Sequence, residues 1–298
     1  MNIIPERLRQ GDTIGLVAPA GPVTPEEIQP TIRMLKDRGF SVMEGANLYK
    51  NQEYLAGSDE ERLHDLHFMF HQDHVKALFC VRGGYGTPRL LEKIDYDLIK
   101  KNPRIIAGYS DITALMLAIH KVTGLVVFHG QMARGVTDVE DRNINSLLEL
   151  LSSDGNIKIE LNVEHVLRGG KARGKLLGGN LSLISSLAGT PYLPSLNGNI
   201  LLIEDRGEPL YRIDRMLTQL KLNGLLDNPG GVIIGNFIDC GDILDINRLV
   251  ISFIPDGCPV YSGFPIGHGD ENRAIPIGAG AVLDTDELSL SFTRACVK

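Results

Sequence analysis

Residues 104–120 read RIIAGYSDITALMLAIH, an apolar strand pattern followed at once by an apolar helical pattern. Residues 104–108 have the length and composition of a buried strand, and residues 111–120 have those of a helix. Ser110 stands between the two, on the turn from strand to helix. A side chain there lies beside the free N–H groups at the start of the helix, where the helix dipole favours a negative charge.

The same alternation of strand and helix runs through the first half of the chain. The predicted strands are residues 13–18, 40–43, 77–81 and 104–108, and the predicted helices are residues 26–38, 59–71, a segment from about Pro88, and residues 111–120. This alternation indicates an α/β fold with a doubly wound parallel sheet and right-handed crossovers. Such sheets bind ligands at the carboxyl ends of their strands, where Ser110 and the pair Gly83-Gly84 both fall.

The pattern changes after residue 150. A polar, turn-forming break at residues 152–156 is followed by segments typical of short strands. Residues 157–161 are interpreted as an exposed edge segment. The predicted strands are residues 199–203, 231–234, 260–262, 281–284 and 288–292, and one clear helix is predicted at residues 211–220. We therefore predict an N-terminal α/β domain at residues 1–152, a linker at 153–173 and a smaller C-terminal β-rich domain at 174–298.

The composition excludes several classes of protein. Of the 298 residues, 43% are hydrophobic and 22% are charged, as in soluble globular proteins rather than disordered chains. The formal net charge of −7 leaves no basic stripe for a nucleic acid. The first apolar run is broken at Pro19, so we expect neither a signal peptide nor a membrane span. The four cysteines lie far apart without a Cys-x-x-Cys pair, which indicates reduced thiols in a cytoplasmic protein.

Ser110 is the first candidate for chemistry. A hydroxyl on a strand-to-helix turn is placed as a nucleophile, and the helix start beneath it can stabilise an oxyanion. The usual hydrolase motif is Gly-x-Ser-x-Gly, and here Ile112 occupies the position of the second glycine. The alternative is that Ser110 only caps the helix that follows it.

A second candidate is the glycine loop, residues 82–86 (RGGYG), which follows a buried strand. Such a loop can cradle a phosphate or supply one N–H group of an oxyanion hole. It lacks the Gly-Lys-Ser/Thr ending of a phosphate-binding P-loop, and Arg89 stands where a dinucleotide fingerprint needs its third glycine. A simple tight turn is the alternative.

Acids and histidines follow strands in the second half. Glu204, Asp205 and Glu208 end one apolar strand, and any of the three could orient an imidazole. His268 lies in a glycine-rich loop after another strand, where burial in a core explains it poorly, although an exposed loop histidine is the commonest case. His129, just after a strand of the first half, is the rival general base.

Two other groups are weaker candidates. His64, His67, His71 and His74 share one helical stripe, but only His67 and His71 have the i, i+4 spacing of a metal site and no Glu lies between them. We interpret the stripe as a solvated helix face and expect no metal. Cys80 precedes the glycine loop but lies within the strand, which disfavours a cysteine nucleophile.

Taken together, these segments resemble the L,D-carboxypeptidase family of serine peptidases, which includes murein tetrapeptide carboxypeptidases and the microcin C self-immunity protein. The matching stretches are residues 11–20 (GDTIGLVAPA), 82–86 (RGGYG), 108–113 (GYSDIT), 177–181 (LGGNL), 203–208 (IEDRGE) with 211–216 (YRIDRM), and 267–268 (GH) with 275–278 (IPIG). They span nearly the whole chain in the order of the family, so the resemblance is specific although each piece alone is weak.

The resemblance implies a triad of Ser110 as nucleophile, His268 as base and Glu204 as orienting acid. It also implies an oxyanion hole formed by the backbone N–H groups of Asp111 and of the glycine pair, with Gly84 favoured over Gly83. The α/β domain would carry the nucleophile and the oxyanion loop, and the β-rich domain the Glu and the His. The family is typically homodimeric and needs no cofactor.

The substrate of an exopeptidase has a free carboxylate, for which a forked Arg is suited. Arg82, Arg206 and Arg273 are the candidates, and the sequence does not rank them.

This chain has no tryptophan. The resemblance implies that the microcin-immunity branch of the family stacks an adenine-like ring on a Trp, so the other branch is favoured here. The favoured branch removes the terminal D-Ala of cytosolic muropeptides during peptidoglycan recycling, so the expected partner is a small peptide. The alternatives are hydrolysis of a microcin-like aminoacyl nucleotide analogue and a non-catalytic module that binds an anionic ligand.

Overall fold

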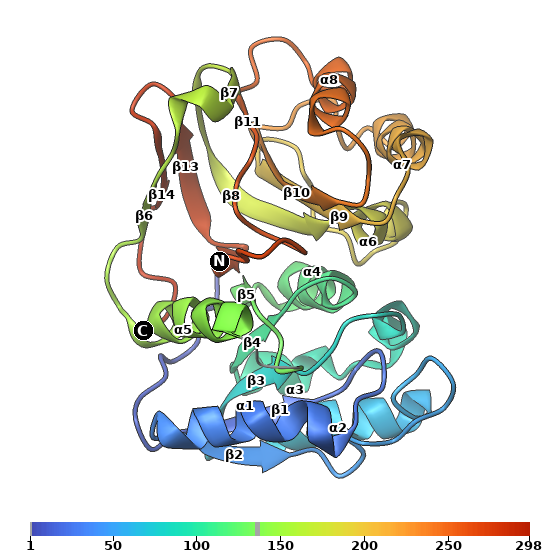
Figure 1. The fold of residues 1–298 in the computed structure, drawn as a ribbon, viewed down its shortest axis with the longest axis vertical. Coiled ribbons are helices and arrows are strands. Elements are labelled where there is room, and N and C mark those ends of the chain that lie inside the picture. The colour runs from blue at the N-terminus through green and yellow to red at the C-terminus, as the bar shows by residue number, and fades with distance from the viewer. Residues whose placement is uncertain (1, 135–137) are drawn as a thin grey trace.

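The structure, a computed structural model, describes residues 2–134 and 138–298 as two sheets with their helices, stacked along the long axis of the molecule (Figure 1). The first sheet has the order β12-β5-β4-β3-β1-β2. Its parallel strands are β1 (Thr13–Val17), β2 (Ser41–Glu44), β3 (Val75–Cys80), β4 (Ile105–Gly108) and β5 (Val127–His129). These strands are buried except for β2 at the edge, which is why their sequences read as continuous apolar runs.

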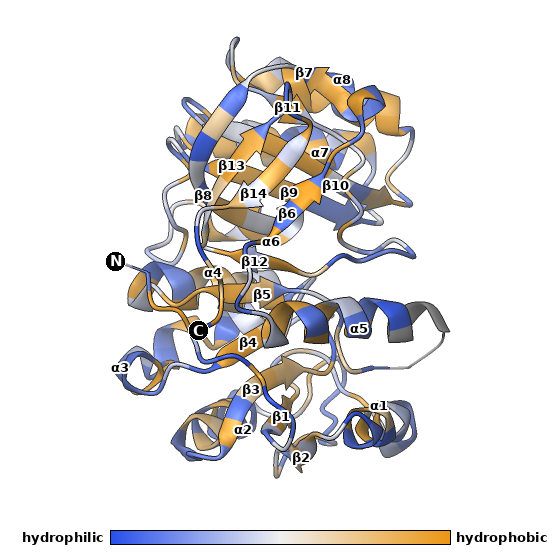
Figure 2. Ribbon diagram, turned by 90° about the vertical axis from the view of Figure 1, so that its left-hand side faces the viewer, coloured by the Kyte–Doolittle hydropathy of each residue, from blue (hydrophilic) through white to orange (hydrophobic). Residues whose placement is uncertain are grey.

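Helices cover both faces of the first sheet. Figure 2 shows α1 (Pro25–Asp37) and α5 (Asp138–Ser152) on one face, and α2 (Asp59–His71) and α3 (Tyr96–Lys101) on the other. This is the doubly wound arrangement that the alternation of strands and helices predicts. The last strand, β12 (Ile275–Ile277), runs antiparallel to β5, so a segment from the end of the chain completes a sheet built by its beginning.

The second sheet has the order β6-β14-β13-β8-β9-β10-β11-β7. Its central strands β8 (Lys171–Asn180), β9 (Ile200–Arg206), β10 (Gly231–Ile238) and β11 (Val260–Tyr261) are parallel, and the outer strands β6 (Lys158–Glu160), β7 (Val166–Arg168), β13 (Gly280–Asp284) and β14 (Ser289–Phe292) pair antiparallel. Three helices pack beside one another against this sheet, α6 (Leu181–Leu187), α7 (Leu210–Leu222) and α8 (Ile243–Phe253) (Figure 1). Strands β6 and β7 and the start of β8 fall within residues 153–173.

Helix α4 (Ile112–Thr123) lies between the two sheets (Figure 1). Every residue from Ile112 to His120 is buried, and the helix contacts β8 and α6 of the second sheet as well as β4 and β5 of the first. The approach is close, because a side chain on Gly179 would meet the Thr113 hydroxyl at 2.7 Å, and the Asn180 amide donates to that hydroxyl at 3.1 Å. The N-terminus of α4, which follows Ser110, is therefore held by both sheets.

The predicted fold class is confirmed, with a parallel N-terminal sheet and a β-rich C-terminal part. The helix predicted from Pro88 is wrong. Two short 3₁₀ turns, Thr87–Arg89 and Leu91–Lys93, occupy its place, because the chain becomes extended at Ile94 and Asp95 caps α3 instead. Helices α5, α6 and α8 were not predicted from the sequence. Asn180 caps α6 and Asp242 caps α8.

Two expectations from composition can be compared with the structure. All four cysteines are buried and unpaired, in agreement with reduced thiols. Among the described residues, none of the helices combines the length and the apolar character needed to span a bilayer.

The contact between β8 and β9 gives a stability prediction. Gly178 has φ +132°, and a Cβ there would overlap the carbonyl oxygen of Leu202 on β9. We expect Gly178→Ala to lower the free energy of unfolding by more than about 2 kcal/mol, because backbone strain adds to a clash with backbone that cannot rotate away. Urea denaturation of the purified variant measures this loss.

Gly198→Ala is the matched control, since Gly198 also has positive φ (+69°) but no atom lies within 4 Å of the place a Cβ would take. Its cost should be about 1 kcal/mol, from the backbone conformation alone. Equal losses of unfolding free energy in the two variants would show that the close contact between β8 and β9 adds no cost beyond that of the backbone conformation.

Candidate active site

Ser110 occupies a strained turn between β4 and α4. Its φ is +61°, a left-handed conformation that is uncommon outside glycine and is concentrated at functional sites. Its carbonyl accepts the Thr113 N–H at 2.9 Å, which starts the helix. The side chain faces Gly83, where an added Cβ would lie 2.9 Å from Ser110 Cβ and 3.0 Å from Oγ. Glycine is therefore required at position 83 for the loop to approach the serine.

The glycine loop (residues 82–86) is fixed by backbone contacts with the β1–α1 connection. Gly21 N–H donates to the Gly83 carbonyl at 2.9 Å, and Arg82 Nη1 donates to the Pro22 carbonyl at 2.5 Å. Neither the Gly84 amide nor the Asp111 amide donates a hydrogen bond to any residue that the structure describes. Both N–H groups remain available to an external acceptor on the two segments that meet at Ser110.

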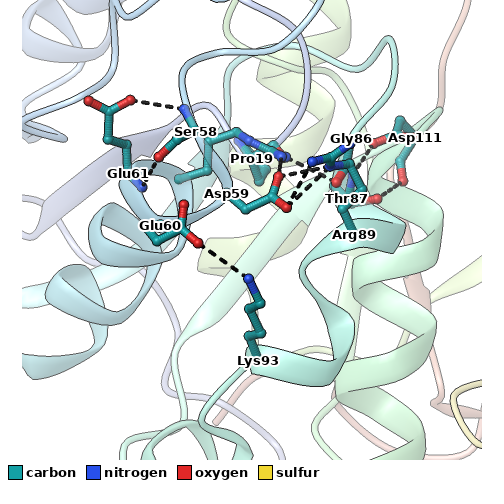
Figure 3. Close-up of polar contacts among 11 residues, drawn as sticks. Pro19, Ser58, Asp59, Glu60, Glu61, Gly86, Thr87, Arg89, Lys93 and Asp111 are labelled. Carbon is teal, nitrogen blue, oxygen red and sulfur yellow. Dashed lines mark hydrogen bonds and ion pairs between the residues drawn. The ribbon is translucent and has the colours of Figure 1, made fainter.

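A buried polar network lies behind the loop (Figure 3). Thr87 N–H donates to Asp111 Oδ2 at 2.8 Å, and the Thr87 hydroxyl donates to the Asp111 carbonyl at 2.6 Å. The buried Arg62 donates to the Gly86 carbonyl at 3.0 Å and to the Pro19 carbonyl, and it pairs with Asp59. Burial raises the pKa of the Asp111 carboxyl, while the Thr87 hydrogen bonds oppose that rise. The network ties the glycine loop to the residue that follows Ser110.

The second sheet contributes a carboxylate–imidazole pair. His268 Nδ1 and Glu204 Oε2 lie 2.7 Å apart, and Glu204 is fully buried at the end of β9. Burial raises the pKa of Glu204, and the hydrogen bond from His268 acts in the opposite direction. Gly267 has φ +104°, and a side chain there would overlap the Glu204 carboxylate. The glycine before His268 is thus what lets the loop close over the acid.

The structure separates the three acids that the sequence left open. Asp205 accepts hydrogen bonds from Asn180 Nδ2 at 2.9 Å and from the N–H and hydroxyl of Ser182 at 2.9 and 2.7 Å, so it holds the start of α6. Glu208 pairs with Arg212 one turn along α7. Only Glu204 among the three contacts His268.

One cavity of about 610 Å³ joins the two halves of the site, and we call it the Ser110 cavity. Its lining residues are Glu27, Arg82, Gly83, Gly84, Tyr109, Ser110, Gln131, Met132, Arg134, Arg206 and His268. The cavity thereby brings together, as predicted from the sequence for a single site, Ser110, His268, Arg82, Arg206, Gly83 and Gly84. Arg273 is not among them and lines a separate cavity with Arg142 and Asn143.

Three further residues of the Ser110 cavity were not predicted from the sequence, namely Tyr109, Gln131 and Arg134. The Tyr109 ring packs edge-on against the His268 ring, with centroids 5.1 Å apart. Gln131 and Arg134 follow β5, so their position after a parallel strand was the signal that could have found them.

The three arginines of the Ser110 cavity differ in what holds them. Arg134 forms an ion pair with Glu27 at 2.7 Å, and Arg206 lies 3.6 Å from Asp239. Arg82 forms no ion pair with any described carboxylate. Its guanidinium is therefore the one in this cavity with the greatest capacity to receive a carboxylate from outside.

Comparison with known proteins agrees with this geometry. The LD-carboxypeptidase N-terminal domain matches residues 14–130, and the LD-carboxypeptidase C-terminal domain matches residues 173–283. The chain belongs to the LD-carboxypeptidase family. It is a carboxypeptidase hydrolase by this membership and by its named relatives.

Two curated relatives and one solved structure illustrate the family. The chain is 42% identical to the "probable murein peptide carboxypeptidase" of Bacillus subtilis, over 96% of this chain and 93% of that one. It is 35% identical to the murein tetrapeptide carboxypeptidase of Pseudomonas aeruginosa, over 92% and 94%. The structure of MccF in complex with glutamyl sulfamoyl guanosine aligns with a TM-score of 0.87 and 25% identity, over 99% of both chains.

The other candidates in this LD-carboxypeptidase lie away from the Ser110 cavity. Among the described residues, no group of three or more His, Cys, Asp or Glu side chains could hold a metal ion, and His67 instead accepts the Asp95 N–H at 3.0 Å. Cys80 is buried within β3, and burial raises the pKa of its thiol to about 12. His67 is thus half-buried and bonded to the segment before α3, whereas His64, His71 and His74 are exposed as expected for a solvated helix face. Cys80 lies within the strand, as the sequence indicated.

His129, the rival base, is buried behind Tyr109 and does not line the Ser110 cavity. Burial, and to a lesser degree the charge of His268, lowers the pKa of His129 from 6.5 to about 3. Neither ring nitrogen meets the geometry of a hydrogen bond with a described residue, although the nearby Asn272 side chain opposes part of the fall in pKa. His129 is therefore a neutral packing residue at physiological pH.

The burial of neutral His129 makes stability depend on pH. Its folded pKa lies below its unfolded pKa, so its contribution is complete above about pH 6.5 and is lost as the pH falls toward 3. Between pH 7 and pH 5 the loss should be about 2 kcal/mol for this one group. We expect His129→Leu to remove that part of the acid sensitivity, measured as the difference in urea-unfolding free energy between the two pH values. An unchanged difference in the variant would mean that His129 binds a proton in the folded state.

Proposed function

We propose that this LD-carboxypeptidase is a serine peptidase that hydrolyses the L,D peptide bond to a terminal D-Ala of muropeptides through an acyl-enzyme. The observation that carries the proposal is the shared cavity of Ser110 and His268, with His268 held by the buried Glu204 at 2.7 Å. A nucleophile, an imidazole and an orienting carboxylate in that order are the parts of a serine hydrolase triad.

The first half of the reaction forms the acyl-enzyme. Because Nδ1 of His268 is bonded to Glu204, Nε2 is the nitrogen left to take the proton of the Ser110 hydroxyl. Ser110 Oγ then attacks the scissile carbonyl carbon, and the carbonyl oxygen becomes an oxyanion. His268 returns the proton to the leaving amine of D-Ala as the C–N bond breaks.

The amides of Gly84 and Asp111 would stabilise the oxyanion in both half-reactions. They flank Ser110, donate to no described acceptor, and lie on segments fixed by the Thr87 and Arg62 contacts. Donors that are already fixed need no reorganisation when charge develops, which is the main source of such stabilisation. In the second half-reaction His268 activates a water, which attacks the ester carbon and releases Ser110.

Substrate recognition follows from the cations around the Ser110 cavity. A carboxypeptidase must bind the free carboxylate of the terminal residue, and a guanidinium does so with two parallel hydrogen bonds. Arg82 is our first choice because it has no described carboxylate partner, and Arg206 is the second because its ion pair is exposed and long. Arg273 lines another cavity, so we leave it out of this proposal.

A second candidate function is hydrolysis of an aminoacyl nucleotide analogue, because MccF aligns over nearly the whole chain. The sequence has no Trp to stack a nucleobase, and the named murein carboxypeptidases are more similar in sequence. We therefore propose peptidoglycan recycling in the cytoplasm, by a homodimer as in the family. Assay of a muropeptide panel against aminoacyl sulfamoyl nucleotides separates the two functions, and exclusive turnover of the nucleotides would reverse our choice.

Removal of the nucleophile is the first test. We expect Ser110→Ala to fold normally and to lose on the order of 10³-fold or more in kcat, because the residual rate then comes from binding and the oxyanion hole alone. Hydrolysis of a D-Ala-terminated tetrapeptide measures the loss, and Ser252→Ala, an exposed serine on α8, is the control. A Ser110→Ala enzyme with near wild-type turnover would remove Ser110 from the mechanism.

The choice of acid is tested by a pH–rate profile. Glu204→Gln keeps the shape of the side chain but removes the charge that stabilises the imidazolium, so we expect a loss on the order of 10²- to 10⁴-fold. The acidic limb of the profile should also move to lower pH. Asp205→Asn should chiefly lower stability, since it weakens the hydrogen bonds to Ser182. If Asp205→Asn instead shifted the acidic limb and Glu204→Gln did not, Glu204 would not be the orienting acid.

A further inference from the structure

A second cavity, of about 650 Å³, lies at the opposite end of helix α4 from Ser110. The last turn of α4 forms one wall, and a helix of this length places its last turn about 18 Å from its start. Helix α3, strand β8 and the segment before β9 form other walls. We call it the lysine cavity, after Lys100, Lys121 and Lys175, which all line it. No described residue lines both this cavity and the Ser110 cavity.

The lysine cavity carries an excess of positive charge. Its three lysines come from three elements, the end of α3, the last turn of α4 and strand β8. No Asp or Glu of the described residues lines it, and none of the three ammonium groups pairs with a carboxylate that the structure describes. Like charges that converge without a counter-ion repel one another. In a chain whose formal net charge is −7, such a grouping favours a site for an external anion.

Lys175 is held in place by a neutral histidine. Its side chain is half-buried, and Nζ lies 3.2 Å from Nε2 of the buried His120. His120 Nδ1 lies 2.9 Å from the Leu125 carbonyl oxygen, so Nδ1 carries the hydrogen and Nε2 accepts from the ammonium group. Burial lowers the pKa of His120 to about 4, and burial also lowers the pKa of Lys175. His120 therefore fixes the ammonium group without neutralising its charge.

The helix dipoles explain only part of this grouping. Lys100 and Lys121 each lie in the last turn of a helix, where the dipole favours a cation. Lys175 lies on a strand, and the His120 carbonyl at the end of α4 already accepts the Gly124 N–H at 2.8 Å. The half-buried ammonium group on β8 is thus left without the counter-ion that would offset the cost of its burial.

Other groups of the cavity wall suit an anion with an organic body. Ser195 Oγ accepts the Asn197 N–H at 3.3 Å, and the hydroxyl hydrogen donates to no acceptor of the described residues. The ammonium group of Lys175 has two hydrogens besides the one bonded to the histidine. Leu177 and Pro194 line the same cavity and add apolar contact surface. The cavity therefore offers charged and hydroxyl donors beside an apolar wall.

We propose that the lysine cavity binds the phosphate group of a small molecule. Ammonium groups act as separate point charges that can surround a phosphate, whereas a carboxylate is best matched by the planar fork of an Arg. A bound phosphate gives Lys175 the counter-ion that it lacks and accepts a hydrogen bond from Ser195. The site does not depend on the proposed peptidase activity, because Ser110 and His268 line a different cavity.

Inorganic phosphate is the probe, titrated into the whole chain by isothermal titration calorimetry at an ionic strength held constant with NaCl. We expect a Kd on the order of 1 mM or lower. Lys175→Gln and Lys121→Gln should each raise that Kd about tenfold or more, because each removes a charge-assisted contact. The matched control is Lys101→Gln, an exposed lysine on α3 that does not line the cavity, and it should keep the wild-type Kd. Glycerol 3-phosphate in a parallel titration distinguishes a phosphate ester from the free ion as the preferred ligand.

Thermal stability gives an independent measurement. A ligand that binds only the folded state raises Tm as its concentration rises. Phosphate should therefore raise the Tm of the wild-type protein and of Lys101→Gln above the value in NaCl of equal ionic strength. The same addition should leave the Tm of Lys175→Gln and of Lys121→Gln at the NaCl value.

Three results would overturn the phosphate site. The first is absence of phosphate binding by the wild-type protein, and the second is an unchanged Kd in Lys175→Gln and Lys121→Gln. The third is loss of binding in Arg82→Gln with retention in both lysine variants, which would place the phosphate in the Ser110 cavity. Because Lys121 is exposed, its variant keeps the test decisive if Lys175→Gln fails to fold.

Discussion

The burial of helix α4 between the two sheets is the constraint on which the site depends. Its side chains from Ile112 to His120 are all excluded from solvent, and β8 approaches it so closely that Gly179 cannot carry a side chain. Burial of this many apolar groups is the largest favourable term in folding, so the two halves of the chain cannot separate without losing it. Because Ser110 immediately precedes this helix, the packing that joins the halves also sets Ser110 opposite His268.

The site accumulates unfavourable features that the surrounding structure offsets. Ser110 has a left-handed backbone, and Glu204, Asp111 and Arg62 are charged groups taken out of water. Each of the three charged groups has partners: His268 for Glu204, Thr87 for Asp111, and carbonyl oxygens with Asp59 for Arg62. A strained backbone and buried charges persist only where many neighbouring contacts hold them in place. Their presence here agrees with a site selected for chemistry rather than for stability.

Prediction from the sequence succeeded where the signal was local. The apolar runs of β1, β3 and β4 and the periodic helices α1 and α2 were found within a few residues, because burial on both faces and a 3.6-residue period are visible in a single segment. Helix α5 was missed, and so were the short elements α6 and β12, whose stability comes from distant partners. Arg134 was missed for the same reason. It lines the Ser110 cavity because β5, which it follows, lies next to β4 in the sheet, and this strand order is not visible in a single segment.

The sequence by itself determined the fold class, the family and the position of Ser110 at the end of a parallel strand. The fold class and the position of Ser110 follow from the order of residues within single segments. The family follows from motifs that occur along the chain in the same order as in the family. The residue types alone left three acids open and only the family resemblance pointed to Glu204, whose contact with His268 the tertiary structure shows. Only the tertiary structure decided that Arg273 lies outside the Ser110 cavity and that Tyr54 packs against Tyr85. The physical reason is distance in space, because neighbouring acids on a strand point to opposite faces and loops far apart in sequence meet only after the sheets have formed.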